Sequence, residues 1–402
     1  MAVALSGGGD SMALLYLAAD WAQARGRRLL ALTVDHNLNA MSADWTRFAD
    51  EAARAVGADW RGLSWDGAQA GPGLTARARA ARHELIAEAA RAAGARVVLL
   101  AHTNDDVAEA DWMRARGSTL GRVREWSPSP VWPQGRGLML LRPLLDERRE
   151  ALRDYLRARG VGWVEDPGNA DERFGRSRAR AALAGADVAL PLEGGRELLG
   201  LPPLAARPDL AWAGVLKVSR DVSASALAAA LLCAGGGAVP PRGEKLAALR
   251  ARLEAGEDFT AGLSGARVEA AGAVVRLMRE PGEMKRRGAK AVGLASGVAA
   301  VWDGRFEIRT TEPGWRVEAA AGRLARLSQA DRRVVAGVPA AARGGLPVLV
   351  RDNESGAMLA WRGADVRALG AQRLGLALGE TTQESDLFQA MHGETPPTDL
   401  FS

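Results

Sequence analysis

The sequence has almost no cysteine and no long apolar run. Cys233 is the only cysteine among 402 residues. A single thiol excludes a structural disulfide within the chain, a CxxC redox pair and an iron–sulfur cluster held by cysteines. No apolar stretch approaches the roughly 20 residues that span a bilayer, and no signal peptide is visible. We therefore expect a cytoplasmic protein without membrane contacts.

Length and composition indicate a globular chain of several domains. A chain of 402 residues predicts two or three domains, and 48% apolar residues suffice for packed cores. The formal net charge of +5 comes mostly from arginine, which suits phosphate recognition. Alanine, glycine and arginine are abundant throughout, so the charge alone is weak support for a nucleic-acid partner.

One hexapeptide, residues 6–11, reads Ser-Gly-Gly-Gly-Asp-Ser and stands between an apolar run and a helix-forming stretch. A strand, a glycine-rich turn and a helix present backbone N–H groups to a phosphate. Three glycines let the backbone approach an anion, two serines offer hydroxyl donors, and one aspartate offers a carboxylate to Mg²⁺. The spacing fits neither a Walker loop nor a G-x-G-x-x-G loop. The residues expected at this nucleotide site are Ser6, Gly7, Gly8, Gly9, Asp10 and Ser11.

The first part of the chain alternates strand and helix patterns, as parallel α/β sheets do. A segment rich in Pro, Ser and Gly, residues 118–137, is expected to be a loop. The clearest elements are strands at 29–34, 96–101, 301–309 and 346–351, helices at 44–56, 74–93, 149–159 and 244–255, and strand alternation over 266–278. We predict an α/β domain with a parallel sheet and helices on both faces (1–185), a linker (186–208), a helical and α+β domain (209–290) and a small strand-rich domain (291–402).

An acidic cluster follows the strand at 96–101, and ligands of open α/β sheets bind at that edge. If a helix starts near Asn104, then Asp105, Asp106 and Glu109 are spaced to place acidic side chains on one face. Such a face suits Mg²⁺ or the ammonium group of an amine substrate. Helix capping is the alternative, and for Asn104 alone we favour it.

Two further groups adjoin this edge. Asp35 and His36 end the second strand, where the nucleoside half of the ligand is expected. For His36 a structural hydrogen-bonding role is equally open. Arg79 and Arg82 are three residues apart on a helix, so they project together toward nucleotide phosphates or an RNA backbone. A solvated basic face is the alternative.

The loop Ser-Gly-Gly-x-Asp-Ser resembles the signature of the PP-loop, or N-type, ATP pyrophosphatases. Together, the motifs over residues 1–183 closely resemble the tRNA(Ile)-lysidine synthetase family in order and spacing. More loosely, residues 240–280 and 301–306 resemble the tRNA-binding regions of that family. The matching motifs are SGGGDS, VDHNL, the arginine helix, AHTNDD-x-x-E, RPLL and W-x-E-DP-x-N followed by R-x-R-x-R.

The resemblance implies a ligase that joins free L-lysine to C2 of the wobble cytidine in tRNA(Ile) with a CAU anticodon. It proceeds through an adenylated cytidine, requires ATP and Mg²⁺, and gives lysidine, AMP and pyrophosphate. The oligomeric state stays open, a homodimer included. The implied roles are catalysis for Asp10, Asp106, Glu109, Arg79, Arg82 and Arg176, ATP binding for Ser6, Gly7, Gly8, Gly9, Asp10, Ser11, Asp35 and His36, lysine binding for Asp106 and Glu109, tRNA binding for Arg176, Arg180, Arg242 and Lys245, and metal binding for Asp10 and Asp105.

Two alternatives remain. Another PP-loop enzyme, such as a tRNA 2-thiocytidine synthetase, would need cysteines for sulfur or a cluster, which Cys233 alone does not supply. A non-catalytic RNA-binding relative would be suggested by loss of the acidic residues, yet all of them are present.

Overall fold

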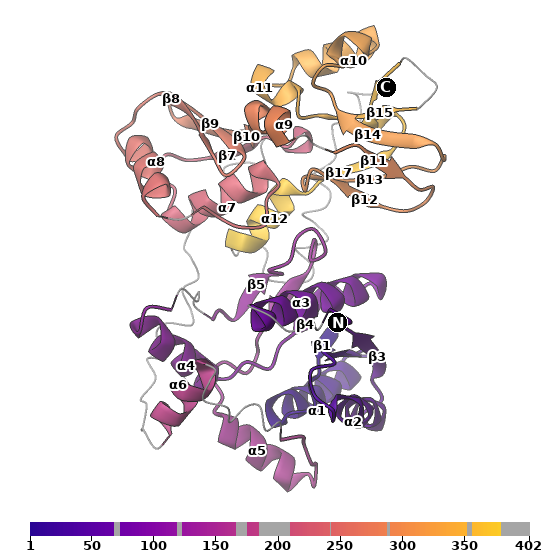
Figure 1. Cartoon of the computed structure of the whole chain (residues 1–402), viewed down its shortest axis with the longest axis vertical. Helices are drawn as coiled ribbons and strands as arrows, with labels where there is room; N and C mark the ends of the chain where they lie inside the picture. Colours follow the sequence, from indigo (N-terminus) through magenta and orange to yellow (C-terminus); the bar gives the residue numbers. More distant parts are fainter. Residues whose placement is uncertain are drawn as a thin grey trace. The chain divides into compact units, whose positions relative to one another are not determined.

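The computed structural model describes residues 1–67, 73–118, 123–165, 175–184, 210–241, 243–287, 290–351 and 356–378. The chain divides into two compact units, Met1–Leu198 and Leu199–Ser402 (Figure 1). The segment predicted as a linker, 186–208, lies outside the described residues. Each unit has its own sheets and its own core, and each is described by itself.

The first unit is built on a six-stranded sheet in the order β3-β2-β1-β4-β6-β5. Five strands are parallel, as the alternating pattern predicted, but β5 pairs antiparallel with β6. The prediction of a loop over 118–137 is therefore wrong for β5, where Ser127 pairs with Leu140. Pro128 lacks an N–H group, which an edge strand tolerates. The strands are β1 (Ala2–Ala4), β2 (Leu30–Asp35), β3 (Asp59–Ser64), β4 (Val97–Leu99), β5 (Trp126–Pro128) and β6 (Met139–Leu141).

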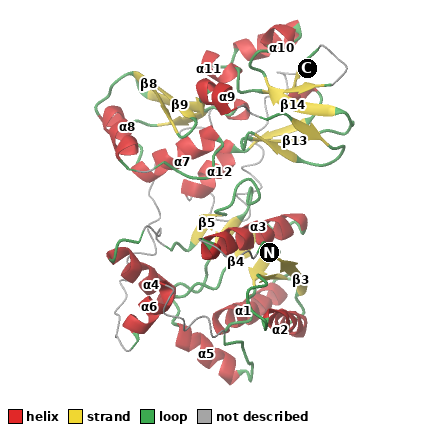
Figure 2. Ribbon diagram, in the orientation of Figure 1, coloured by secondary structure: helices red, strands yellow, loops and turns green. Residues whose placement is uncertain are grey.

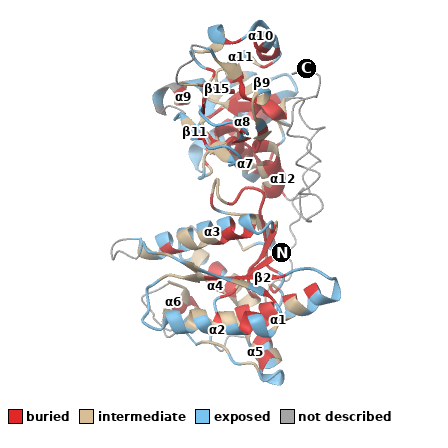
Figure 3. Cartoon of the chain, turned by 90° about the vertical axis from the view of Figure 1, so that its right-hand side faces the viewer, coloured by how far each residue is buried: buried red, intermediate tan, exposed pale blue. Residues whose placement is uncertain are grey.

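Helices cover both faces of this sheet, which confirms the predicted layering. Figure 1 shows α3 on one side of the strands and α1 and α2 on the other. Leu30 and Leu32 of β2 pack with Ile86 and Ala90 of α3. Figure 3 shows buried residues along the strands between these layers, as expected for a sheet covered on both faces. The helices are α1 (Gly9–Ala24), α2 (Ser42–Ala55), α3 (Leu74–Ala92), α4 (Asn104–Ala115), α5 (Arg149–Ala158) and α6 (Gly175–Leu183).

The second unit begins with an antiparallel sheet in the order β7-β10-β9-β8 and with helices packed on it (Figure 2). Ser223 caps α7 by accepting a hydrogen bond from the amide of Ala226. The alternating run at 266–278 forms two strands that turn at Gly272, whose φ is +55°. The elements are β7 (Leu216–Val218), β8 (Phe259–Leu263), β9 (Ala266–Ala271), β10 (Val274–Arg279), α7 (Ala224–Gly235), α8 (Glu244–Glu254) and α12 (Gly370–Leu378).

The rest of the second unit holds two smaller antiparallel sheets, β11-β14-β15-β16 and β12-β13-β17. Trp302, Phe306 and Trp361 join their cores through ring contacts. These regions agree with the predicted helical and α+β character after the α/β part. The elements are β11 (Val292–Leu294), β12 (Ala300–Trp302), β13 (Phe306–Arg309), β14 (Trp315–Ala319), β15 (Pro347–Val350), β16 (Met358–Leu359), β17 (Asp365–Ala368), α9 (Pro281–Arg287), α10 (Gln329–Ala336) and α11 (Ala340–Arg343), with 3₁₀ turns η2 (Ala211–Ala213), η3 (Leu324–Arg326) and η4 (Ala360–Arg362).

Within the described ranges, no helix is both long enough and apolar enough to cross a membrane.

Candidate active site

The glycine-rich loop joins β1 to α1 and leaves the first amides of the helix free of side-chain capping. Gly7 has a φ of +83°, and its carbonyl accepts a hydrogen bond from the Val164 amide at 2.9 Å. The Ser11 hydroxyl donates to the Gly8 carbonyl at 2.9 Å and lies 3.0 Å from the Ser6 hydroxyl. An uncapped helix start with a fixed loop in front of it suits an anionic phosphate.

The acidic cluster lies at the start of α4, where a side chain caps the helix. Thr103 is the N-cap residue, so the expectation that Asn104 caps the helix is wrong. The Asp106 carboxylate accepts hydrogen bonds from the amide and the hydroxyl of Thr103, at 2.9 and 3.2 Å. This capping box holds α4 and fixes the orientation of Asp106. Asp105 has a different partner: its Oδ2 accepts a hydrogen bond from the Arg149 amide at 2.8 Å.

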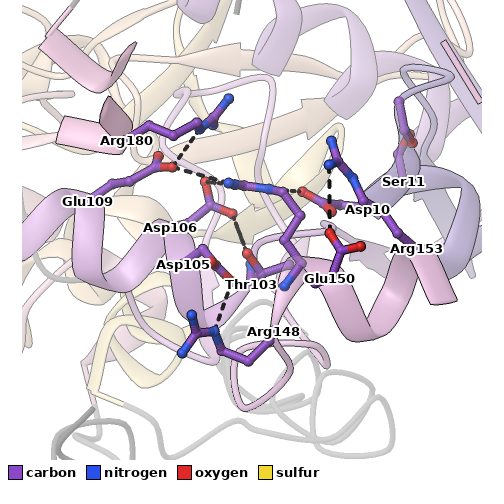
Figure 4. A network of polar contacts seen from close by, with 12 residues as sticks. Asp10, Ser11, Thr103, Asp105, Asp106, Glu109, Arg148, Glu150, Arg153 and Arg180 are labelled. Atoms are coloured by element: carbon purple, nitrogen blue, oxygen red, sulfur yellow. Dashed lines mark hydrogen bonds and ion pairs between the residues drawn. The ribbon is translucent and has the colours of Figure 1, made fainter. Parts of the chain in front are cut away.

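Arg149, the first residue of α5, connects the glycine-rich loop to α4. Its Nε donates to Asp10 at 3.0 Å, and its terminal nitrogens lie 3.3 Å from Glu109 and 3.8 Å from Asp106. Glu109 also accepts a hydrogen bond from Arg180 Nε at 2.9 Å. Figure 4 shows Asp10, Asp106, Glu109 and Arg180 converging from three segments of the chain. The acids predicted to act on the substrate therefore meet at one place.

Burial and charge set the ionisation of these acids. Burial raises the pKa of Asp10, although Arg149 acts against it. Burial acts in the same direction on Asp106, but the Thr103 amide and His102 outweigh it, so the pKa of Asp106 is lowered. Asp10 Oδ1 and Glu109 Oε2 are buried without a hydrogen-bond partner among the described residues. These two oxygens are free to accept another cation.

Helix α3 carries two arginines, Arg79 and Arg82, for which the described residues supply no carboxylate partner. Within the described part of the chain, neither Arg79 nor Arg82 forms an ion pair or a hydrogen bond. Burial, followed by the charges of Arg79 and Arg176, lowers the pKa of Arg82 to about 10. A group of cations that repel one another favours an anionic ligand.

A pocket of about 580 Å³ brings most of these residues together. His36 at its wall makes an edge contact with the Trp65 ring, with centroids 5.9 Å apart. Gly7, Arg79, Asp105 and Glu109 are not among the lining residues, although Glu109 reaches Arg149 and Arg180 on the wall. The predicted site residues that line it are Ser6, Gly8, Gly9, Asp10, Ser11, Asp35, His36, Arg82, Asp106, Arg176 and Arg180.

The two remaining residues predicted to bind tRNA belong to the second unit. Lys245 is exposed on α8, and Arg242 lies outside the described residues. Asp166 and Asn169 of the W-x-E-DP-x-N motif also lie outside them.

The sequence of this chain is similar to those of known proteins. A family model described as a PP-loop domain matches residues 1–186. A curated tRNA(Ile)-lysidine synthase of Caulobacter vibrioides is 45% identical to this chain, and the alignment covers 96% of this chain and 94% of that protein. The chain belongs to the tRNA(Ile)-lysidine synthase family. A relative from Hyphomonas neptunium with the same name is 37% identical over 67% of this chain and 78% of its own length. The family predicted from the motifs is thereby confirmed, and its PP-loop domain supports ATP binding.

Sequence reasoning missed Arg149 as a site residue. The signal for it was present, because Arg148 and Arg149 open a helix, where the helix dipole disfavours positive charge. Arginines at that position need nearby acids, and Asp10, Asp105 and Glu109 supply them.

Proposed function

We propose that the protein ligates free L-lysine to C2 of the wobble cytidine of tRNA(Ile) with a CAU anticodon, at the expense of ATP. The products are lysidine, AMP and pyrophosphate. ATP and tRNA are its proposed partners in the cytoplasm. The proposal rests on one observation above all: a PP-loop and a buried acid pair, Asp106 and Glu109, lie around a single guanidinium beside one pocket.

In the first step, the C2 carbonyl oxygen of cytidine attacks the α-phosphorus of ATP, and the bond to the β-phosphate oxygen breaks. Negative charge grows on the departing pyrophosphate. The uncapped amides at the start of α1 and the hydroxyls of Ser6 and Ser11 would bind that group. Arg82 and Arg176, which line the pocket, would stabilise phosphate charge or hold the anticodon backbone.

In the second step, the ε-amine of lysine attacks C2, and the bond between C2 and its adenylated oxygen breaks, so that AMP leaves with that oxygen. The amine must first lose a proton, since the pKa of a lysine ammonium is near 10.4 in water. Asp106 and Glu109 would orient the ammonium, and one of them would accept the proton. The target base must be unstacked for this attack.

The donor set of the loop also fits Mg²⁺. Asp10 Oδ1 is buried without a described partner, and Mg²⁺ bound to a polyphosphate needs only one or two carboxylates. Asp10 would hold the ion through Oδ1. Asp105, whose Oδ2 accepts a hydrogen bond from the Arg149 amide, is the second proposed ligand through its other oxygen. When bound, the ion would neutralise charge on the leaving pyrophosphate.

Sulfur chemistry has little support in this chain. Cys233 is 3% exposed within the core of the second unit, and burial raises its pKa to about 12. A thiol of this kind is a poor nucleophile.

The test is incorporation of labelled lysine into a tRNA(Ile) transcript that carries CAU, with ATP and Mg²⁺. Elongator tRNA(Met), which shares that anticodon, is the control. Label in tRNA(Ile) alone is expected. Tight binding of ATP and tRNA without label in either would contradict the proposal and would favour another modification or a binding-only role.

A further inference from the structure

The acids proposed to bind the lysine ammonium already hold a cation that belongs to the chain. The Arg149 guanidinium lies within 3.8 Å of carboxylate oxygens of Asp10, Asp106 and Glu109. The side chains are largely buried, with exposed fractions of 16% for Arg149 and 2% for Glu109. Buried carboxylates without a cation are costly, so the ligand-free site needs such a partner.

We propose that Arg149 is a resident cation of the amine site, beside Arg180 at Glu109 and Arg176 at Asp106, and that the substrate ammonium displaces its guanidinium from these two acids. The proposal rests on the proposed function only in naming lysine as the amine. Arg149 would then be a positioning residue that keeps the acids aligned until the substrate arrives, and that competes with the substrate for them.

The backbone of Arg149 has an anchor that does not depend on its side chain. Its amide donates to Asp105 Oδ2 at 2.8 Å, and the neighbouring Glu147 carbonyl accepts from the Asn104 amide at 2.9 Å. The start of α5 thus stays joined to α4 when the guanidinium leaves. The guanidinium that leaves Asp106 and Glu109 can remain paired with Asp10, because its Nε contact with Asp10, at 3.0 Å, is the shortest of its three carboxylate contacts.

The acids also keep room for a second cation. Glu109 Oε1 accepts from both Arg149 and Arg180, at 3.3 and 2.9 Å, whereas its Oε2 is buried and has no partner among the described residues. An ammonium can approach Oε2 before the guanidinium has left Oε1. During such an exchange Glu109 keeps its ion pair with Arg180, so its buried carboxylate is never without a cation.

Competition lowers the apparent affinity for the amine. If the guanidinium occupies the acids in about nine of ten molecules, lysine binds about tenfold more weakly than to an open site. Removing the competing charge should therefore tighten lysine binding, an effect that mere structural damage would not produce.

Calorimetric titration of L-lysine into the full chain tests this. Arg149→Met should lower the Kd for lysine about tenfold, whereas Arg149→Lys, which keeps a cation, should stay within about threefold of the parent protein. Arg157→Met is the matched control, because Arg157 lies on the same helix but pairs with Glu150 and Asp154. Unchanged or weaker lysine binding by a folded Arg149→Met protein overturns the proposal.

A second probe separates this proposal from the proposed function. Guanidinium chloride at millimolar concentration should raise the melting temperature of Arg149→Ala relative to NaCl, and should not raise that of the parent protein. If lysine binds to no form of the chain but guanidinium stabilises Arg149→Ala, the cation site stands and lysine is the wrong amine. If neither cation binds the variant, Arg149 is not a resident cation.

Discussion

One oxygen of Asp106 caps the helix that carries it, because Oδ2 accepts a hydrogen bond from the Thr103 amide at 2.9 Å. The other oxygen, Oδ1, lies 3.6 Å from Arg176 and 3.8 Å from Arg149. The Asp106 carboxylate thus caps the N-terminus of α4 and also takes part in the charge network of the site. The two roles are separable by substitution.

Asp106→Asn keeps an acceptor for the cap but removes the charge. We expect lysine ligation to fall about 100-fold or more, while the free energy of unfolding falls less than in a variant that also removes the acceptor. Asp106→Ala should show the same loss of activity and a further loss of about 1 kcal/mol in stability. Urea denaturation and labelled-lysine incorporation measure the two effects.

Thr103→Val is the converse control, since it removes the capping hydroxyl and leaves the Asp106 charge in place. It should cost about 1 kcal/mol of stability and much less activity than Asp106→Asn. If Asp106→Asn retained full ligation, its charge would have no part in the reaction.

Glu109 allows a prediction that separates lysine binding from ATP binding. Glu109→Gln removes the buried charge that faces Arg149 and Arg180, so the KM for lysine should rise about tenfold or more while the KM for ATP changes little. Asp111→Asn is the matched control, because Asp111 lies on the same helix, is exposed and pairs with Arg114. An equal rise in both KM values for Glu109→Gln would indicate general distortion of the site.

Local sequence signals predicted the helices and loops of this site well, but they did not predict which of these segments contact one another in the fold. The start of α4 at Asn104 and of α5 at Arg149 followed from helical patterns. The pairing of Arg149 with Asp10 joins residues 139 apart, and no local rule gives such a contact. The predicted N-cap of α4 was also wrong. Thr103 and Asp106 form a reciprocal capping box, which is more favourable than the single Asx cap expected at Asn104.

The antiparallel strand β5 was missed for a related reason. Residues 126–128 include a proline and are too short to alternate visibly, so their composition predicts a loop. Their pairing with β6 is set by the neighbouring strand, which the sequence around Pro128 does not reveal.

His83 makes the stability of the protein depend on pH. It is 6% exposed, and burial together with the charges of Arg82 and Arg79 lowers its pKa to about 3. In the unfolded chain the pKa of His83 is near 6.5. Between pH 3 and pH 6.5, His83 is therefore protonated in the unfolded chain and neutral in the folded chain. The contribution of His83 to the free energy of unfolding is therefore fully present above pH 6.5 and is lost as the pH falls toward 3.

Denaturant titrations of the parent protein and His83→Gln at pH 7.5, 6.0 and 5.0 measure this effect. The parent should lose more stability on acidification, by at most about 1.4 kcal/mol per pH unit for one proton. The comparison uses each protein's own value at pH 7.5, so a constant cost of the substitution cancels. Parallel slopes for the two proteins would show that His83 titrates normally in the fold.

Gly7 is the position where the phosphate loop depends most on glycine. Its φ of +83° lies in the left-handed region, and an added Cβ would stand 3.4 Å from Val164 and 3.5 Å from Phe48. Gly7→Ala should therefore cost about 1–2 kcal/mol through backbone strain. The loop relieves that strain by moving, so the affinity for ATP should fall about tenfold or more, as measured by calorimetry.

Gly162→Ala is the control for this change, because its Cβ would meet nothing within 4 Å and its φ is not in the left-handed region. It lies two residues before Val164, whose amide holds the Gly7 carbonyl at 2.9 Å. It should leave ATP affinity unchanged. Equal effects of the two substitutions would mean that added bulk near the loop, rather than the backbone conformation of Gly7, limits ATP binding. Normal ATP affinity of Gly7→Ala would mean that the phosphates do not need this loop conformation.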